Sequence, residues 1–312
     1  MRTGVQVIGD SRDSQAAASV LTTESGANLR GADILSLAKP RIAGLAVFMA
    51  AAGMALGPHR PGPLTALATL AGTALAAGGA SALNMYLERE SDRLMFRTRH
   101  RPLPAGRVPP RFALAFGAAL ALGSVTVLAL AVNPLTALLG AVAITFYAFL
   151  YTPLKRRTPY ALHVGTVPGA MPPLIGWTAA SGALGGPGLV LFAIMLLWQV
   201  PHFMAIAIYC RADYGRAGIR CYPVERGIHA AIRHAILYAG LLVPVSLIMV
   251  PLGVAGWFYA TAATVLGVGF AAAAATAFER LGATGWAKRL FHASLIYLPA
   301  LSVALLIDVS LP

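Results

Sequence analysis

Long apolar stretches constrain the fold of this sequence more than any other feature. A helix needs about 20 mostly apolar residues to cross a bilayer, and it satisfies its own backbone hydrogen bonds there. Hydrophobic residues make up 58% of the 312 residues and charged residues 11%, which excludes an ordinary soluble domain. We find stretches of spanning length at 41–58, 63–86, 111–132, 134–152, 160–181, 188–211, 231–252, 256–278 and 288–309. The sequence therefore predicts an all-α, polytopic membrane bundle with about nine transmembrane helices.

The segment before the first stretch has a different character. Residues 1–34 are polar and of mixed charge, without the pattern of a signal or transit peptide. We expect a disordered cytoplasmic tail at 1–34, followed by a transmembrane domain over 35–312. The absence of a transit peptide favours a bacterial membrane.

Lysine and arginine predict the orientation of the bundle. The net charge of +13 could suggest a nucleic-acid partner, but the basic residues fall between apolar stretches and not on one soluble domain. They lie before the first stretch and in alternate connections, with Arg60 as the exception. By the positive-inside rule, the N-terminus faces the cytoplasm, and an odd number of spans places the C-terminus outside. We expect a protein of the bacterial inner membrane that binds no nucleic acid.

The second connection carries the densest group of charges. Asn84, Glu88 and Asp92 are spaced by four residues, so they share one face of a helix that leaves the membrane. Their oxygen atoms suit Mg²⁺, which proteins often hold with one or two carboxylates together with substrate phosphates. Arg97 and Arg101 follow and offer guanidinium groups to phosphate oxygens. This pattern favours a metal–diphosphate site over a solvated loop, which would not explain the shared face of the acids.

A second acidic position lies at the exit of the sixth stretch. Asp213 would face the first cluster from the same side of the membrane, so we assign it to the same metal site. His202 is eleven residues earlier, about three turns deeper on the same helical face, and Gln199 accompanies it. A lone histidine in a membrane helix can also simply bond a neighbouring helix. We weigh a substrate-binding role for Gln199 and His202 equally against that packing role.

Two basic groups remain ambiguous. Lys155 and Arg156 follow an aromatic helix end, a pattern that fits either an interfacial anchor or a contact to the diphosphate. The Lys39-Pro40-Arg41 segment at the mouth of the first stretch has the same ambiguity, and we favour an anchor there.

Together these segments resemble a known family. The sequence is similar to the protoheme IX farnesyltransferases, or heme O synthases, of the intramembrane UbiA-type prenyltransferase superfamily. The segments that carry the resemblance are the stripe at Asn84, Glu88 and Asp92, the run Arg97 to Leu103, the segments Tyr151 to Thr158 and Gly165 to Trp177, Trp198-Gln199-Val200-Pro201-His202-Phe203, and Asp213-Tyr214. Glu88 and Glu90 depart from the aspartates usual there, and Arg220, Cys221, Tyr222 and Glu225 depart from a more apolar run.

The resemblance implies a function as well as a fold. It implies a helical bundle around a central cavity, and transfer of farnesyl from farnesyl diphosphate to a vinyl group of heme B, with addition of water, to give heme O. It implies Mg²⁺ on Asn84, Glu88, Asp92 and Asp213, and a diphosphate held by Arg97, Arg101, Lys155 and Arg156. It also suggests a downstream heme A synthase as a partner. Two alternatives stay open at this point: a prenyltransferase that acts on an aromatic acid or quinone precursor, and a transporter.

Overall fold

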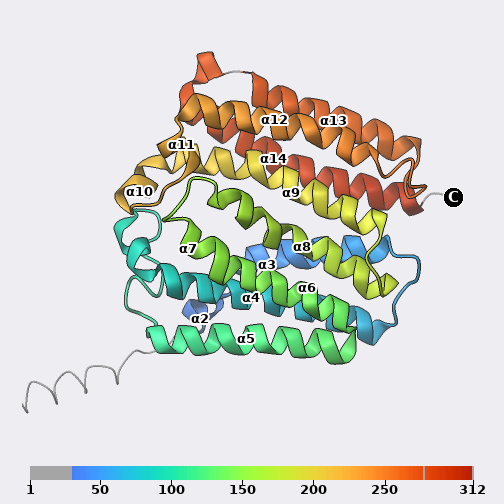
Figure 1. Cartoon of the computed structure of the whole chain (residues 1–312), viewed down its shortest axis with the longest axis horizontal. Helices are drawn as coiled ribbons and strands as arrows, with labels where there is room; N and C mark the ends of the chain where they lie inside the picture. Colours follow the sequence, from blue (N-terminus) through green and yellow to red (C-terminus); the bar gives the residue numbers. More distant parts are fainter. Residues whose placement is uncertain (1–29, 277, 311–312) are drawn as a thin grey trace, which may run out of the picture.

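The structure is a computed structural model that describes residues 30–276 and 278–310, and its long helices run side by side in a bundle (Figure 1). No strand occurs among these residues, so the predicted all-α class is confirmed. Eight of the described helices are long: α3 (Pro40–Ala55), α4 (Pro63–Leu94), α5 (Pro110–Ala131), α8 (Ala161–Ser181), α9 (Gly186–Tyr209), α12 (Ile228–Leu247), α13 (Trp257–Ala275) and α14 (Phe278–Ser310). Helix α14 has a break at Gly282.

The fourth predicted stretch forms a composite helix. It consists of α6 (Pro134–Thr145), the π-helix η1 (Phe146–Tyr151) and α7 (Thr152–Leu154). Short helices α2 (Gly31–Leu37), α10 (Arg211–Arg216) and α11 (Tyr222–Glu225) lie outside the long ones. Proline occupies the first turn of several long helices, among them α3, α4, α5 and α6, where its missing N–H costs no hydrogen bond and its fixed φ favours the helix.

The predicted number of nine spans is approximate. Seven helices of the described chain are long and apolar enough to cross a membrane, and the bent pair α2 and α3 raises the number to eight. Helix α8 is also 21 residues long, but it is not among these seven helices, because its prolines and glycines lower its mean hydropathy. Most of its side chains are buried against neighbouring helices, so α8 needs little lipid-facing apolar surface.

Helix α8 packs unusually close to α3. A Cβ built on Gly176 would lie 1.8 Å from the carbonyl oxygen of Ala50, and one built on Gly53 would lie 2.0 Å from that of Pro173. Any side chain at either glycine would separate the two backbones. The small residues of α8 therefore place this proline-containing helix against α3, beside the interior of the bundle.

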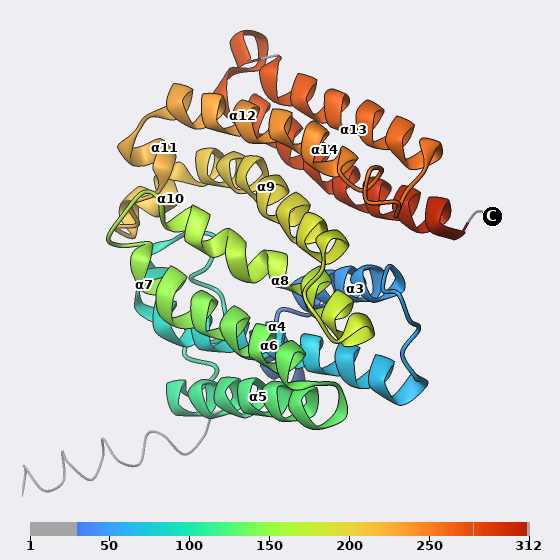
Figure 2. The same ribbon diagram turned by 45° about the vertical axis from the view of Figure 1, so that its right-hand side comes forward.

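The connections with the most charge gather at one end of the molecule. Helices α10 and α11 and the connection between α4 and α5 lie together at the left end in Figure 1, and a view turned by 45° keeps them together (Figure 2). The connection between α7 and α8 reaches the same end, because the backbone N–H of Arg220 donates to the carbonyl oxygen of Lys155 at 2.9 Å. This end therefore brings together segments from three separate parts of the sequence.

The described chain begins before the predicted domain boundary. Residues 1–29 of the predicted tail lie outside the described residues, but residues 31–34 belong to helix α2. Lys39 then adopts a left-handed conformation with φ of 47°, and the axis bends by 49° between α2 and α3. Such a conformation is uncommon for a residue other than glycine. It marks Lys39 as a residue whose surroundings hold it in place.

Candidate functional site

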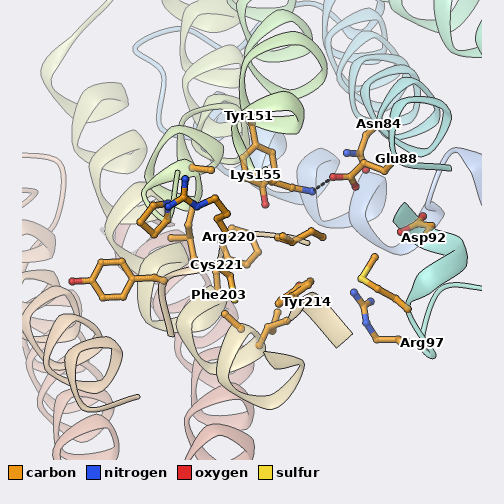
Figure 3. Close-up of a pocket in the computed structure, with 18 of the residues that line it drawn as sticks. Asn84, Glu88, Asp92, Arg97, Tyr151, Lys155, Phe203, Tyr214, Arg220 and Cys221 are labelled. Carbon is orange, nitrogen blue, oxygen red and sulfur yellow. Dashed lines mark ion pairs between the residues drawn. The ribbon is translucent and has the colours of Figure 1, made fainter. Parts of the chain in front are cut away.

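A polar cavity of about 250 Å³ opens where the charged connections meet. Figure 3 shows side chains that converge on it from α4, from the end of η1 and α7, from α9 and from the segment around α10. Six residues assigned to the site from the sequence line this cavity: Asn84, Glu88, Asp92, Arg97, Arg101 and Lys155.

Glu88 and Lys155 form the central ion pair of the cavity. Lys155 Nζ lies 2.8 Å from Glu88 Oε1, and both side chains are mostly buried. The ammonium group also lies 4.4 Å from the ring centroid of Tyr151, within cation–π distance. Burial alone would lower the pKa of Lys155, yet the neighbouring Tyr151 and Glu88 raise it above its ordinary value. Lys155 is therefore a cation across the physiological pH range.

Asn84 is fixed by contacts on both sides of its amide. Its Nδ2 donates to Thr152 Oγ1 at 2.9 Å, and its Oδ1 accepts from Lys39 Nζ at 3.3 Å. Thr152 Oγ1 in turn donates to the carbonyl oxygen of Tyr147 at 2.8 Å. The left-handed turn at Lys39 thus directs a lysine into the cavity, where we had expected a membrane anchor.

Asp92 is the most buried of the acidic residues in the cavity, with 1% of its surface exposed. Its Oδ2 accepts a hydrogen bond from Arg101 at 2.8 Å, whereas its Oδ1 is buried and has no hydrogen-bond partner among the described residues. A buried carboxylate oxygen without a partner is costly unless something else satisfies it. An oxygen-binding cation meets that need.

The residues of the cavity fit Mg²⁺ with a substrate and not a metal ion alone. Among the described residues, no three His, Cys, Asp or Glu side chains are grouped so that they could hold a metal. The unpartnered oxygen of Asp92, the amide oxygen of Asn84 and the carboxylate of Glu88 are all hard ligands on one helix face. Mg²⁺ commonly completes such a sparse set with phosphate oxygens and water.

Asp213 is not among the residues that line the cavity, and its predicted part in the metal site stays a prediction. Its two carboxylate oxygens accept from the backbone N–H groups of Phe96 and Arg97 at 3.2 and 3.4 Å, and it pairs with Arg216. The structure therefore joins the two acidic segments as expected, but through the backbone of the loop that carries Arg97. In this structure Asp213 fixes that loop.

The structure separates Arg156 from Lys155, and the predicted contact of Arg156 with the diphosphate stays a prediction. The turn after α7 directs Lys155 into the cavity and leaves Arg156 exposed, and Arg156 is not among the lining residues. Sequence adjacency could not separate the two, because their directions depend on where the helix ends.

The π-helix η1 supplies two aromatic residues that our sequence analysis did not assign to the site. Tyr147 and Tyr151 line the cavity, with ring centroids 5.6 Å apart. The π-bulge adds a residue to one turn and so changes which side chains face inward, and such bulges are frequent at functional sites. Tyr214, Arg220, Cys221 and Tyr222 line the cavity as well. The only sequence signal for the last three was their departure from the family pattern.

A second, apolar cavity of about 360 Å³ lies next to the polar one. Tyr147, Tyr151, Phe203 and Ile206 line both cavities, so the two are neighbours. Most of the remaining wall consists of aliphatic residues from α3, α4, α6 and α8. Gln199 and His202, the two deeper positions predicted from the sequence, line this apolar cavity.

Gln199 is held by the backbones of two helices. Its Nε2 donates to the carbonyl oxygens of Thr166 and Met195 at 2.9 and 3.0 Å. A Cβ built on Gly169 would lie 1.9 Å from Oε1 of Gln199, so any larger residue at position 169 would displace this amide from its present position. Gln199 therefore contributes to helix packing and to the cavity wall.

His202 is bound to a helix far away in the sequence. Its Nδ1 lies 2.7 Å from Ser294 Oγ, and its ring stacks against Trp198 and Phe291 with centroid distances of 4.8 and 5.0 Å. Ser294 Oγ also donates to the carbonyl oxygen of Phe291 at 2.6 Å. The hydroxyl has one proton, so it accepts from an Nδ1–H of His202. In the neutral ring this leaves Nε2 with a lone pair.

Comparison with known proteins identifies the family of this chain. The model of the UbiA prenyltransferase family matches residues 46–295. The chain belongs to the UbiA prenyltransferase family. Its relatives include the protoheme IX farnesyltransferases of Anaeromyxobacter sp. (strain Fw109-5) and Myxococcus xanthus (strain DK1622). Each is 49% identical, and the alignments cover 88% of this chain and 92% and 94% of the relatives.

Solved structures share the fold of this chain. A digeranylgeranylglyceryl phosphate synthase structure matches with a TM-score of 0.76 at 17% identity, over 89% of this chain and 98% of the other. A UbiA homolog from Archaeoglobus fulgidus bound to DMAPP and Mg²⁺ matches with a TM-score of 0.65 at 15% identity, over 90% and 100% of the two chains. At these identities the likeness establishes the UbiA fold.

Asp92 and Asp213 occupy different positions, so we expect their substitution by asparagine to affect prenyl transfer differently. Asp92→Asn should lower kcat/KM by roughly 100-fold, because it removes charge from the cavity itself. Asp213→Asn should lower it less and should make the loop around Arg97 exchange its amide hydrogens faster, because its carboxylate holds that backbone. Steady-state kinetics and hydrogen exchange measure the two effects. Equal activity of Asp92→Asn and wild type would contradict this assignment of the cavity.

Proposed function

We propose that this protein is a protoheme IX farnesyltransferase, which transfers the farnesyl group of farnesyl diphosphate to a vinyl group of heme B and forms heme O. The observation that carries the proposal is the pair of adjacent cavities, one lined by acids, cations and an amide and the other mostly apolar. Such a pair suits a substrate with a charged head and a long hydrocarbon chain. The relatives with 49% identity bear the same name.

The polar cavity would receive the diphosphate together with Mg²⁺. Asn84, Glu88 and Asp92 would hold the ion, which when bound supplies positive charge that neutralises the diphosphate. Lys39, Lys155 and Arg101 now contact these three side chains. In the complex these three cationic side chains would bind phosphate oxygens. The acids would then bind the metal ion, so both groups would exchange their present partners for the metal–diphosphate substrate.

The transfer then needs a stabilised leaving group and a dry site. Arg97, Arg101 and Lys155 stabilise the negative charge that develops on the diphosphate as the allylic carbon–oxygen bond breaks and the diphosphate takes the electron pair. The vinyl group attacks the farnesyl carbon and forms the new carbon–carbon bond, which leaves positive charge on the carbon next to the porphyrin. Water adds to this carbon and releases a proton. The aliphatic wall of the second cavity keeps water from the allylic cation before that.

His202 is suited to bind the heme. Its Nδ1–H is engaged by Ser294, so the Nε2 lone pair of the neutral ring is available, and neutral imidazole is a common iron ligand. A second residue that orients a ligating histidine also raises the basicity of that histidine. His202 would bind the heme iron where it lines the apolar cavity, next to the chain of the allylic substrate.

The orientation completes the proposal. The excess of Lys and Arg supports an orientation in a bacterial inner membrane in which the polar cavity and the N-terminus face the cytoplasm and the C-terminus lies outside. A heme A synthase would be the partner that takes up the product.

The proposal is tested by a choice of acceptor. Purified protein in nanodiscs receives labelled farnesyl diphosphate, Mg²⁺ and either heme B or hydroxybenzoate, and the products are separated by mass. We expect farnesylated, hydrated heme with heme B and no product with hydroxybenzoate. Transfer to hydroxybenzoate alone would replace the proposal by an aromatic or quinone-precursor prenyltransferase. No reaction with either acceptor, in protein that carries solutes across the membrane, would favour a transporter.

The role of His202 predicts a selective loss of heme binding. His202→Ala should shift or remove the Soret band of bound heme, while farnesyl diphosphate with Mg²⁺ still binds, because the diphosphate and the ion are held in the polar cavity, which His202 does not line. His292→Ala serves as the matched control, since His292 is exposed and bonded within its own helix. An unaltered Soret band and normal transfer in His202→Ala would leave His202 with its packing role only.

A further inference from the structure

The segment between α10 and α11 forms one side of the polar cavity. Ile219, Arg220, Cys221 and Tyr222 all line it. The segment is anchored to the opposite connection, because the backbone N–H of Arg220 donates to the carbonyl oxygen of Lys155 at 2.9 Å. Arg220 is therefore bound directly to the residue whose ammonium group pairs with Glu88. In Figure 3, Lys155 is drawn between Glu88 and Arg220.

The guanidinium group of Arg220 is held in a defined orientation. Its Nε and Nη2 donate to the two carboxylate oxygens of Glu225 at 2.8 and 3.1 Å, and its Nη1 donates to the carbonyl oxygen of Arg157 at 3.2 Å. An arginine has five N–H donors. These contacts use three of them and leave one N–H on each terminal nitrogen for another acceptor.

The pair of Arg220 and Glu225 is better suited to orientation than to stability. Both side chains are substantially exposed, at 50% and 31%, and exposed ion pairs contribute little to folding. The bidentate geometry nevertheless fixes the plane of the guanidinium group. Arg220 stabilises the charged form of Glu225 and so lowers the pKa of its carboxyl, which keeps the contact intact at neutral pH.

We propose that Arg220 is a further binding residue for the diphosphate of the allylic substrate, and that Glu225 is the residue that positions it. This inference rests on the proposed function. Arg220 adds a cation to the wall that already carries Lys155, Arg97 and Arg101. Its two remaining N–H groups would meet phosphate oxygens, and the backbone hydrogen bond to Lys155 joins the two segments that carry these cations. Planar, oriented donors are well suited to phosphate.

The alternative is a purely structural role, in which Arg220 and Glu225 only hold two connections together. In that case Arg220 and Glu225 would only hold the α10–α11 segment against the turn after α7. A loss of either residue would then lower stability and leave the affinity for the diphosphate unchanged. Exchange of the two charges separates these roles, because it restores the ion pair but removes the cation at position 220.

The experiment measures KM for farnesyl diphosphate with heme B and Mg²⁺, together with thermal unfolding, in the same nanodiscs. Arg220→Gln should raise KM about tenfold with a much smaller change in kcat, the signature of lost substrate binding. Arg220→Lys keeps the charge but lacks the planar guanidinium group, so its KM should lie between those of the wild type and Arg220→Gln. Glu225→Gln should raise KM less than Arg220→Gln. Arg226→Gln is the matched control. It also removes one arginine charge, one residue after Glu225, but Arg226 does not line the cavity.

The exchanged variant, with Arg220→Glu and Glu225→Arg, decides between the two roles. We expect wild-type thermal stability with KM at least as high as in Arg220→Gln. Recovery of both stability and KM would overturn the inference, as would an unchanged KM in Arg220→Gln.

Binding of inorganic pyrophosphate with Mg²⁺, measured by calorimetry, separates this inference from the proposed function. Weaker pyrophosphate binding in Arg220→Gln supports the inference even if heme is not the acceptor. Equal pyrophosphate binding in the two proteins overturns it even if heme is farnesylated.

Discussion

The pairing of buried charges at the end of α4 is the interaction on which the site depends. Glu88 and Asp92 lie on one face of α4. Glu88 pairs with Lys155 and Asp92 pairs with Arg101, and both cations come from other segments. Removing one partner of a buried pair costs roughly 3–5 kcal/mol, since the other charge is left unpaired in a medium of low polarity. The ligand-free protein therefore needs these cations, and a metal–diphosphate substrate offers the acids and the cations new partners of opposite charge at the same time.

Irregular backbone is concentrated around these pairs. The left-handed turn at Lys39 directs its ammonium group to Asn84, and the π-helix turns Tyr147 and Tyr151 toward the cavity. The close approach of α3 and α8 at Gly176 holds the wall of the apolar cavity together. Each of these features would be a cost in a regular bundle, and each places a side chain or a wall that the two cavities require.

Local pattern was sufficient to predict much of this arrangement. Apolar length predicted the long helices, because lipid permits few alternatives. Helical periodicity placed Asn84, Glu88 and Asp92 on one face, since the period of an α-helix does not depend on tertiary contacts. Both predictions use only neighbours in sequence, and the resemblance to a known family added the chemistry.

Contacts between distant segments could not be predicted in the same way. The sequence could not tell that Asp213 binds the backbone of the loop at Phe96 and Arg97, or that the turn after α7 separates Lys155 from Arg156. The contact of His202 with Ser294 joins residues on α9 and α14, and no spacing rule connects them. The roles of Lys39 and Arg220 likewise depend on backbone geometry that appears only in the folded protein.

The central claim is that acids and cations in the polar cavity act as one receptor for a metal–diphosphate group. The most direct measurement is the equilibrium affinity for a non-reactive farnesyl diphosphate analogue with and without Mg²⁺, in the wild type and in Asp92→Asn. The account predicts that Mg²⁺ tightens binding by about tenfold or more in the wild type and has little effect in Asp92→Asn. Equal affinity of the wild type with and without Mg²⁺, or a full Mg²⁺ effect in Asp92→Asn, would contradict it.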